Sequence, residues 1–327
     1  MKVKLLFSCS HFRTSHDFLI GEILFTDNNN ILTSEFLDKQ FVFKVGVSKM
    51  ETAFKNSSLG YYLFDFPINE EREYDDTRLI QQLHSFAYKV GYWWRFLWFA
   101  KDNSSHLGDL FVEVPEKHGC IIFSEFDSYS NSSGTHEQSV FTKDDLLFVS
   151  DMVKRYSQYM EGTTTYSLDE YELARPDNEL NGAFQSKPKT YPYNQNRRIE
   201  RAWIFVTFAR RTEFLPMKIS LYVPLFESLF SSGNIKREVM AKRIANYIQE
   251  GSSDVESTMN DAYLFRHKYI HGSELMDYSK LEEQKQLSEK VDNIARKVLT
   301  KIFLNDLDIY KEKQSKLYDW FNVLDRR

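Results

Sequence analysis

The alternation of apolar and polar positions divides the chain into two parts with different periodicity. In the first third, short apolar runs at residues 3–9, 18–25, 41–47, 110–115 and 120–126 are separated by turn-forming residues, which predicts strands. Beyond residue 197, apolar residues recur at helical spacing. This spacing predicts helices near 197–213, 216–232, 235–250, 254–271, 280–303 and 306–323, which an antiparallel bundle would bury.

Two further helices are predicted between these parts. The segment 76–101 is apolar around most of its circumference, so we expect it to be largely buried. A second helix is predicted at 142–160, followed by a Pro-containing, exposed connection over 161–196. Pro224 is expected to kink its helix or to start a turn within it, and Gly233 and Gly251 are expected to end the second and third helices. The pattern predicts a mixed α+β N-terminal domain (1–141), a helix with a connecting loop (142–196) and an all-α helical domain (197–325).

Composition supports a folded protein in a reducing compartment. Hydrophobic residues make up 42% of the 327 residues and aromatic residues 16%, which supplies ample core material. The only two cysteines, Cys9 and Cys120, suggest no disulfide framework. The N-terminal apolar run lacks a cleavage-site pattern, and no run of about 18 apolar residues occurs, so we expect a cytoplasmic protein without a membrane span.

Charge is distributed unequally between the two parts. Residues 1–196 carry 19 Lys and Arg against 28 Asp and Glu, whereas residues 197–327 carry 23 against 19. A polyanion such as RNA is therefore better tolerated by the C-terminal part, although this bias alone does not prove nucleic-acid binding.

The stretch YLFRHKYIHGSE at 263–274 concentrates cations in an apolar setting. On the predicted 254–271 helix, Val255, Met259, Ala262 and Ile270 lie within about 80° of one another, and Arg266 falls in the middle of this stripe. An unpaired buried charge is costly, so Arg266 must be paired or must face an interface.

Two histidines lie beside this stripe. His267 and His271 are four residues apart on one flank, and Gly272 is expected to end the helix. Arg266 and His271 are about 140° apart on an ideal helix, so they share a substrate only if the last turn loosens or a second copy of the helix completes the site. In the structural alternative, Arg266 pairs with Glu227 and His271 is favoured by the helix dipole.

The order of motifs over residues 221–272 adds context to this stretch. An apolar helix with FESLF is followed by a helix with KRIANYI and then by Tyr-x2-Arg-x4-His-Gly. The Arg-x4-His spacing is weak evidence by itself, because Arg78 and His84 give a similar spacing that we interpret as structural. The whole order, however, resembles the HEPN superfamily, and within it the ApeA-type HEPN domains of bacteria. The run WFAKDNSS at 98–105 resembles a segment upstream in related proteins. Ser273 differs from the tyrosine of the subgroup that pairs with nucleotidyltransferases.

This resemblance implies metal-independent RNA cleavage at a homodimer interface, without a cofactor. His271 would be the acid/base, because imidazole ordinarily titrates near a pH of about 6.5. Arg266 would hold the phosphate. His267 and Lys268 would bind scissile or neighbouring phosphates. Glu227 and Arg243 are the remaining supporting residues, and they would orient Arg266 and His271 by hydrogen bonds.

The expected role is that of a toxin or antiphage-defence effector, whose N-terminal domain senses a trigger or binds an inhibitor.

Three alternatives remain. A fold without catalysis would leave an RNA- or protein-binding dimer. A zinc site at His267-x3-His271 lacks the glutamate of the HExxH pattern, since Lys268 occupies that place. Two further groups have two readings each. The aromatic residues of 92–99 could stack on RNA bases or form core. An RNA path or a solvated surface would equally explain the pairs Arg210-Arg211 and Lys242-Arg243.

Overall fold

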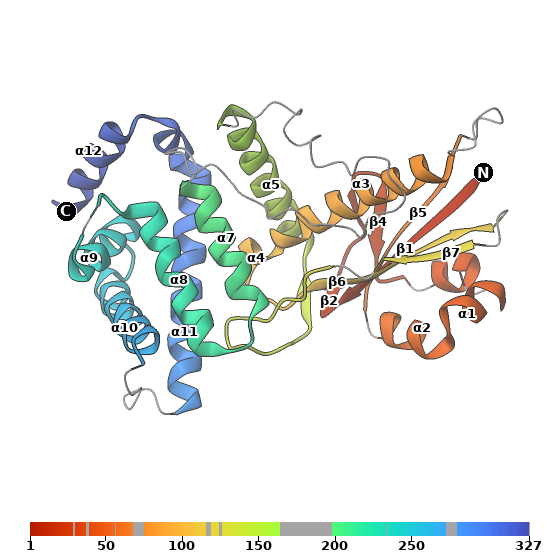
Figure 1. Ribbon diagram of the computed structural model, residues 1–327, viewed down its shortest axis with the longest axis horizontal. Helices are drawn as coiled ribbons and strands as arrows, with labels where there is room; N and C mark the ends of the chain where they lie inside the picture. The colour runs from red at the N-terminus through yellow and green to blue at the C-terminus, as the bar shows by residue number, and fades with distance from the viewer. Residues whose placement is uncertain are drawn as a thin grey trace, which may run out of the picture.

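A sheet-containing region and a helical region lie side by side, with the chain termini at opposite ends (Figure 1). The computed structural model describes residues 1–28, 30–36, 39–55, 57–67, 75–115, 119–123, 126–163, 198–233, 235–272 and 280–326. An antiparallel sheet region followed by a mostly helical region agrees with the predicted fold class at this level of detail.

The sheet has six strands, all paired antiparallel. In spatial order they are β3 (Phe18–Ile20), β4 (Ile23–Thr26), β5 (Leu59–Asp65), β1 (Lys2–Ser10), β6 (His106–Val114) and β7 (Gly119–Phe123). The apolar runs at 3–9, 18–25, 110–115 and 120–126 thus correspond to strands, the second run forming the β3–β4 hairpin. Strand β5 was not predicted. A separate parallel pair joins β2 (Phe12–Thr14) to β8 (Ser139–Phe141).

Both faces of the sheet are covered. Side chains alternate along β1, so Leu5 and Phe7 enter the main core on the side of α3 (Asp75–Arg95). Leu6 points to the opposite face and joins a smaller core with Phe111, beneath α1 (Lys39–Val45) and α2 (Val47–Phe54). Figure 1 shows α3 along one face and the α1–α2 pair on the other.

The predicted strand at 41–47 is wrong, because this segment is helical. Its aromatic and β-branched residues favour a strand by composition. The buried positions nevertheless follow helical spacing, with Phe41 and Val45 in α1 and Met50 and Phe54 in α2. Gly46 separates the two helices with a φ of 91°, a value that suits glycine. Burial against the sheet therefore overrode local propensity.

The helical region contains six long helices after residue 197 among the described residues. They are α7 (Arg198–Arg211), α8 (Leu215–Phe230), α9 (Arg237–Ile248), α10 (Ser252–Ile270), α11 (Leu281–Lys301) and α12 (Gln314–Asp325). The first five agree with the predicted ranges to within a few residues. The predicted helix at 306–323 is instead a 3-10 turn (Leu307–Lys311) followed by α12, and a π-helical turn (Ile302–Asp306) comes directly before them.

The helix ends agree with expectation in one case and differ in another. Helix α8 continues through Pro224. Gly233 follows α8 with a φ of 101°, as expected for a helix end. Helix α9, however, ends at Gln249, whose φ is 72°, and Gly251 caps the start of α10 instead.

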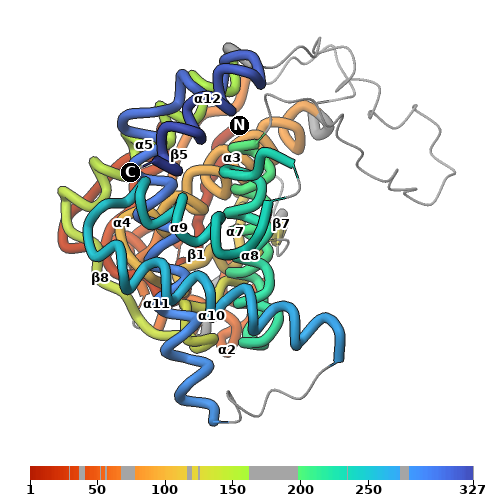
Figure 2. Tube along the Cα trace, turned by 90° about the vertical axis from the view of Figure 1, so that its left-hand side faces the viewer, coloured from red at the N-terminus to blue at the C-terminus, as the bar shows by residue number. Residues whose placement is uncertain are grey.

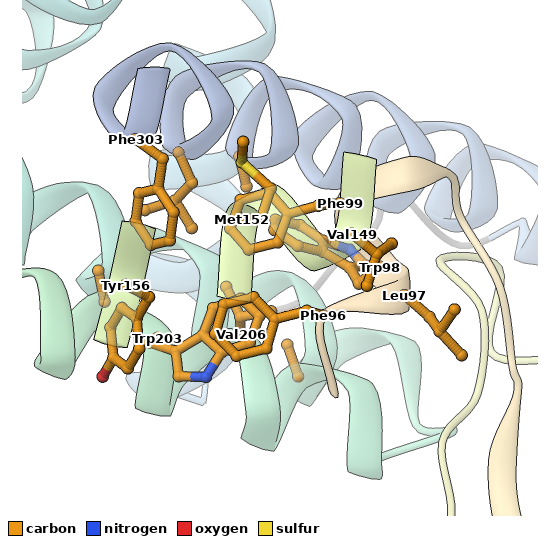
Figure 3. Packing of buried hydrophobic residues seen from close by; sticks show 14 of the residues in the cluster. Phe96, Leu97, Trp98, Phe99, Val149, Met152, Tyr156, Trp203, Val206 and Phe303 are labelled. Atoms are coloured by element: carbon orange, nitrogen blue, oxygen red, sulfur yellow. The ribbon is translucent and has the colours of Figure 1, made fainter. Parts of the chain in front are cut away.

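The two regions share one continuous hydrophobic core. The predicted 76–101 helix is α3 followed by the short α4 (Leu97–Ala100). It is largely buried only at its C-terminal end, since Ile80 and Tyr88 of α3 are exposed, so the expectation of burial holds for part of the segment. Phe96 and Phe99 pack against Trp203 of α7, and Phe99 also contacts Phe303 (Figure 3). Aromatic residues of 92–99 thus form core. Helix α5 (Lys143–Thr163) also joins this core, while the predicted connection beyond it lies outside the described residues.

Candidate functional site

Helix α10 carries the candidate site at its C-terminal end. Val255, Met259 and Ala262 are buried, as the apolar stripe predicts, whereas Ile270 is 58% exposed. Gly272 adopts a φ of 69° immediately after the last turn, which confirms it as the helix stop. In Figure 2 this end of α10 protrudes beyond the neighbouring helices. The stripe therefore anchors the helix and leaves its last turn accessible.

Arg266 pairs with Glu227 of α8. The distance from Nη1 to Oε1 is 3.4 Å, and both side chains are 38% exposed. The cost of an unpaired charge required Arg266 either to be paired or to face an interface, and the structure shows it paired. Because a guanidinium has five N–H donors and this contact uses one terminal nitrogen, Arg266 can keep Glu227 while it binds an oxyanion.

Two imidazoles lie on the same helix end as Arg266. His267 and His271 are both exposed, and their ring centroids are 4.6 Å apart. The backbone N–H of His271 still donates to the carbonyl of His267 at 3.1 Å, so His271 ends the helix rather than leaving it. Lys268 is half-buried on the same turn. Because the last turn stays helical, Arg266 and His271 remain about 140° apart around the helix axis. The structure thus places Arg266, His267, Lys268 and His271 on one helix end, and it joins Arg266 to Glu227.

Arg243 does not join this group. Its guanidinium forms two bonds with Asp325 of α12, from Nε at 2.7 Å and from Nη2 at 2.6 Å. It also donates to the carbonyl of Phe230 and lies over the ring of Phe321. With only 2% of the residue exposed, Arg243 fixes α12 against α8 and α9. The expectation that it orients Arg266 and His271 or binds RNA is therefore wrong.

Tyr263 is the tyrosine of the Tyr-x2-Arg-x4-His-Gly order, and no role is predicted for it from the sequence. Its hydroxyl is buried and has no hydrogen-bond partner in the part of the chain that the structure describes. Burial raises the pKa of Tyr263, Glu227 raises it further and Arg266 opposes the shift. Tyr263 thus stays protonated beside the ion pair. Its position three residues before Arg266 was the available signal, because such residues are neighbours on a helix.

The surface around the end of α10 is apolar. Phe214 is 59% exposed and Met217 is 40% exposed at the start of α8, and Ile270 adds a third apolar side chain. The ring of Phe214 contacts that of Tyr269, with centroids 6.2 Å apart. These residues offer a place for another surface to pack beside the imidazoles.

A second charged cluster lies where segment 98–105 meets the helices. Asp292 of α11 accepts hydrogen bonds from Trp98 Nε1 at 2.7 Å and from the Tyr222 hydroxyl at 2.5 Å. It also pairs with Arg296, and Asp292 is only 1% exposed. Segment 98–105 is thus tied to the helical region by a buried carboxylate.

Two cations of this junction are buried as well. Lys218 donates to Ser130 Oγ at 3.0 Å and to the Ala209 carbonyl at 2.8 Å, and burial lowers its pKa to about 8. Arg210 donates to Asn103 and is 2% exposed, so it does not line an RNA path. The junction cluster therefore has the geometry of a structural network.

Histidines also gather in the sheet region. The rings of His11, His106 and His136 have mutual centroid distances of 5.5 to 6.3 Å. Burial lowers the pKa of His11 and of His106, which favours the neutral imidazole. Within the described ranges, no group of three or more His, Cys, Asp or Glu side chains is arranged to hold a metal ion.

The chain matches no protein-family model, no curated protein and no solved structure. In the described part of the chain, no helix is both long and apolar enough to cross a membrane.

Proposed function

We propose that the protein is a metal-independent endoribonuclease of the HEPN type. The observation that carries this proposal is the C-terminal end of α10, which carries two exposed imidazoles and an arginine paired with Glu227. RNA cleavage by its own 2′-hydroxyl needs these groups, namely a proton acceptor, a proton donor and a cation on the phosphate.

The proposed reaction is an internal transfer. The 2′-oxygen forms a bond to phosphorus, the bond from phosphorus to the 5′-oxygen breaks, and a 2′,3′-cyclic phosphate and a 5′-hydroxyl result. His271 exchanges the protons, removing one from the 2′-hydroxyl or delivering one to the leaving oxygen. Arg266 stabilises the charge on the phosphorane, while His267 and Lys268 hold neighbouring phosphates.

A homodimer would complete this site. The reaction uses two proton transfers, and a second copy of α10 would supply a second imidazole. Phe214, Met217 and Ile270 are exposed apolar side chains that such a partner would cover. A homodimer through the helical region is therefore part of the proposal.

In cells, such a ribonuclease would act as a toxin or antiphage-defence effector in the cytoplasm. The sheet region would then sense a trigger or restrain the nuclease. Because the buried junction around Asp292 fixes the two regions to each other, a change in one could alter the other.

The alternative function is a non-catalytic dimer that binds RNA or a protein. It is favoured by the Arg266–Glu227 contact, which also serves as a structural ion pair in a folded but inactive domain.

Incubation of the purified protein with total RNA and with tRNA in EDTA separates these functions. The proposed nuclease produces fragments with 2′,3′-cyclic phosphate and 5′-hydroxyl ends under these conditions. Measurable RNA binding without any cleavage supports the non-catalytic dimer, and cleavage that disappears in EDTA contradicts the proposed chemistry.

A further inference from the structure

A cavity of about 740 Å³ lies between the sheet and the α1–α2 pair, far along the chain from the α10 residues. The polarity of the cavity follows from strand β1. On the sheet face beneath α1 and α2, the side chains of β1 change from the buried Leu6 to Ser8 and Ser10. Helices α1 and α2 pack on the apolar end of this face and leave a space over the serines. The space is therefore lined by serine hydroxyl groups together with apolar side chains such as Leu107 and Phe126.

A local irregularity of the sheet shapes the cavity floor. The pairing of β1 with β6 shifts register between Phe7 and Cys9. The Ser8 hydroxyl bonds to the backbone N–H of Asp109 at 2.7 Å, and a Cβ on Gly108 would lie 2.4 Å from this hydroxyl oxygen. Glycine at 108 thus permits this close approach. Such bulges redirect side chains, here the carboxylate of Asp109.

One cation lines the cavity. Lys49 Nζ lies 3.3 Å from Asp109, and the two side chains are 40% and 22% exposed. Exposed pairs of this kind contribute little stability, and an ammonium group has three donors. Lys49 can therefore bind an anion without releasing Asp109. Lys49 also belongs to the first turn of α2, whose cap Gly46 has no side chain to occupy the first amide N–H groups.

The rest of the lining is uncharged and of two kinds, because Val45, Ala53, Leu107 and Phe126 are apolar and the other side chains are polar. Ser10, Ser48 and Ser128 contribute hydroxyls. His106 Nδ1 lies 3.0 Å from the Ser104 carbonyl, which favours a proton on Nδ1 and leaves Nε2 as an acceptor. With one lysine for an anion and several partners for hydroxyls, the lining matches a small molecule that carries both.

We propose that this cavity binds a small phosphate monoester of a sugar or nucleoside, with the phosphate on Lys49 and the amino end of α2. The remaining hydroxyls of the ligand face the serines, His106 and Asp109. This site is distinct from the proposed ribonuclease site, and its occupancy does not depend on RNA cleavage.

Calorimetry on the full chain tests this proposal with three probes, each alone: a ribose phosphate, adenosine monophosphate and inorganic phosphate. At least one ester binds at millimolar concentration or better. Lys49→Met, which keeps the apolar stem near Phe111, weakens this binding by about ten- to hundredfold, the effect of losing a charge-assisted bond. Lys55→Met, at the exposed other end of α2, is the matched control and leaves the affinity unchanged.

A variant with the opposite effect sharpens the test. Asp109→Asn removes the negative charge beside the phosphate and tightens binding severalfold, while the backbone contacts of residue 109 with Ser8 remain. Absence of binding by all three probes overturns the proposal. Equal affinities in the wild type and Lys49→Met also overturn it, and binding of inorganic phosphate without either ester overturns the assignment of a monoester.

Discussion

The protein uses arginines and acidic residues in two different ways, at the buried junction and at the exposed end of α10. At the junction, Asp292 is 1% exposed and accepts bonds from three side chains. At α10, Arg266 has one ion pair and is 38% exposed. A charge that is surrounded by partners can only hold the fold, whereas a charge with remaining donors and solvent access can bind a substrate. The spacing of the residues in the sequence does not distinguish these two cases.

The largest effect expected from this comparison is on stability at the junction. Asp292→Ala leaves the Trp98 N–H, the Tyr222 hydroxyl and Arg296 without their shared acceptor, which costs about 4 kcal/mol. Urea unfolding measures this loss. The control Asp308→Ala removes a carboxylate that is 94% exposed and changes the unfolding free energy by less than about 0.5 kcal/mol. Equal values for both variants would refute the structural role of the junction.

A somewhat smaller loss is expected for Arg243. Arg243→Ala leaves Asp325 unpaired and the Phe230 carbonyl without its donor, which destabilises the docking of α12 by about 3 kcal/mol. RNA cleavage by the fraction that remains folded should persist, because Arg243 does not contact Arg266 through these bonds. Loss of cleavage in fully folded Arg243→Ala would show that Arg243 does contribute to the proposed ribonuclease site.

Much of this architecture follows from sequence periodicity. The α10 stripe, its Gly272 stop and five of the helices of the C-terminal region were predictable, because helical periodicity over ten or more residues is a strong signal. Segment 41–47 was not, since its residues favour strands locally and only the sheet face selects the helix. Arg243 was misassigned because its partner Asp325 lies 82 residues away, and no local pattern predicts that contact. The environment of Tyr263 was not predicted, although the residue belongs to the quoted motif, because burial of its hydroxyl depends on tertiary packing.

Buried Lys218 should make stability depend on pH in the alkaline range. Its pKa is about 8 in the folded protein against an ordinary value of 10.5, so the unfolded chain binds more protons between these values. Stability therefore rises with pH over this window, by about 2 kcal/mol up to pH 10. Burial raises the pKa of Tyr222, which opposes the trend as unfolded tyrosines ionise. The measurement is therefore the free energy of unfolding between pH 8 and pH 10 for wild type and for Lys218→Met. The variant lacks the lysine, so the rise in stability with pH is absent from it. Parallel curves would contradict a buried, titrating lysine.

The smallest effect is expected from a matched pair of tyrosines. Tyr222→Phe removes a hydroxyl that donates to Asp292 and costs about 1.5 kcal/mol. Tyr263→Phe removes a hydroxyl that has no partner in the described residues, so the unfolding free energy stays within about 0.5 kcal/mol of wild type or increases. Thermal and urea unfolding of both variants test this contrast. A larger loss for Tyr263→Phe would mean that its hydroxyl is bonded in the folded protein.

The central claim is that the end of α10 performs chemistry without holding the fold, and His271→Ala tests it most directly. RNA cleavage and urea unfolding are measured on the same preparation, with His16→Ala as a control at another exposed histidine. We predict that His271→Ala lowers the cleavage rate by about 10²- to 10⁴-fold, the usual effect of losing a general acid or base. We expect its unfolding free energy to stay within about 0.5 kcal/mol of wild type. Cleavage by His271→Ala at the rate of wild type and His16→Ala would contradict the account.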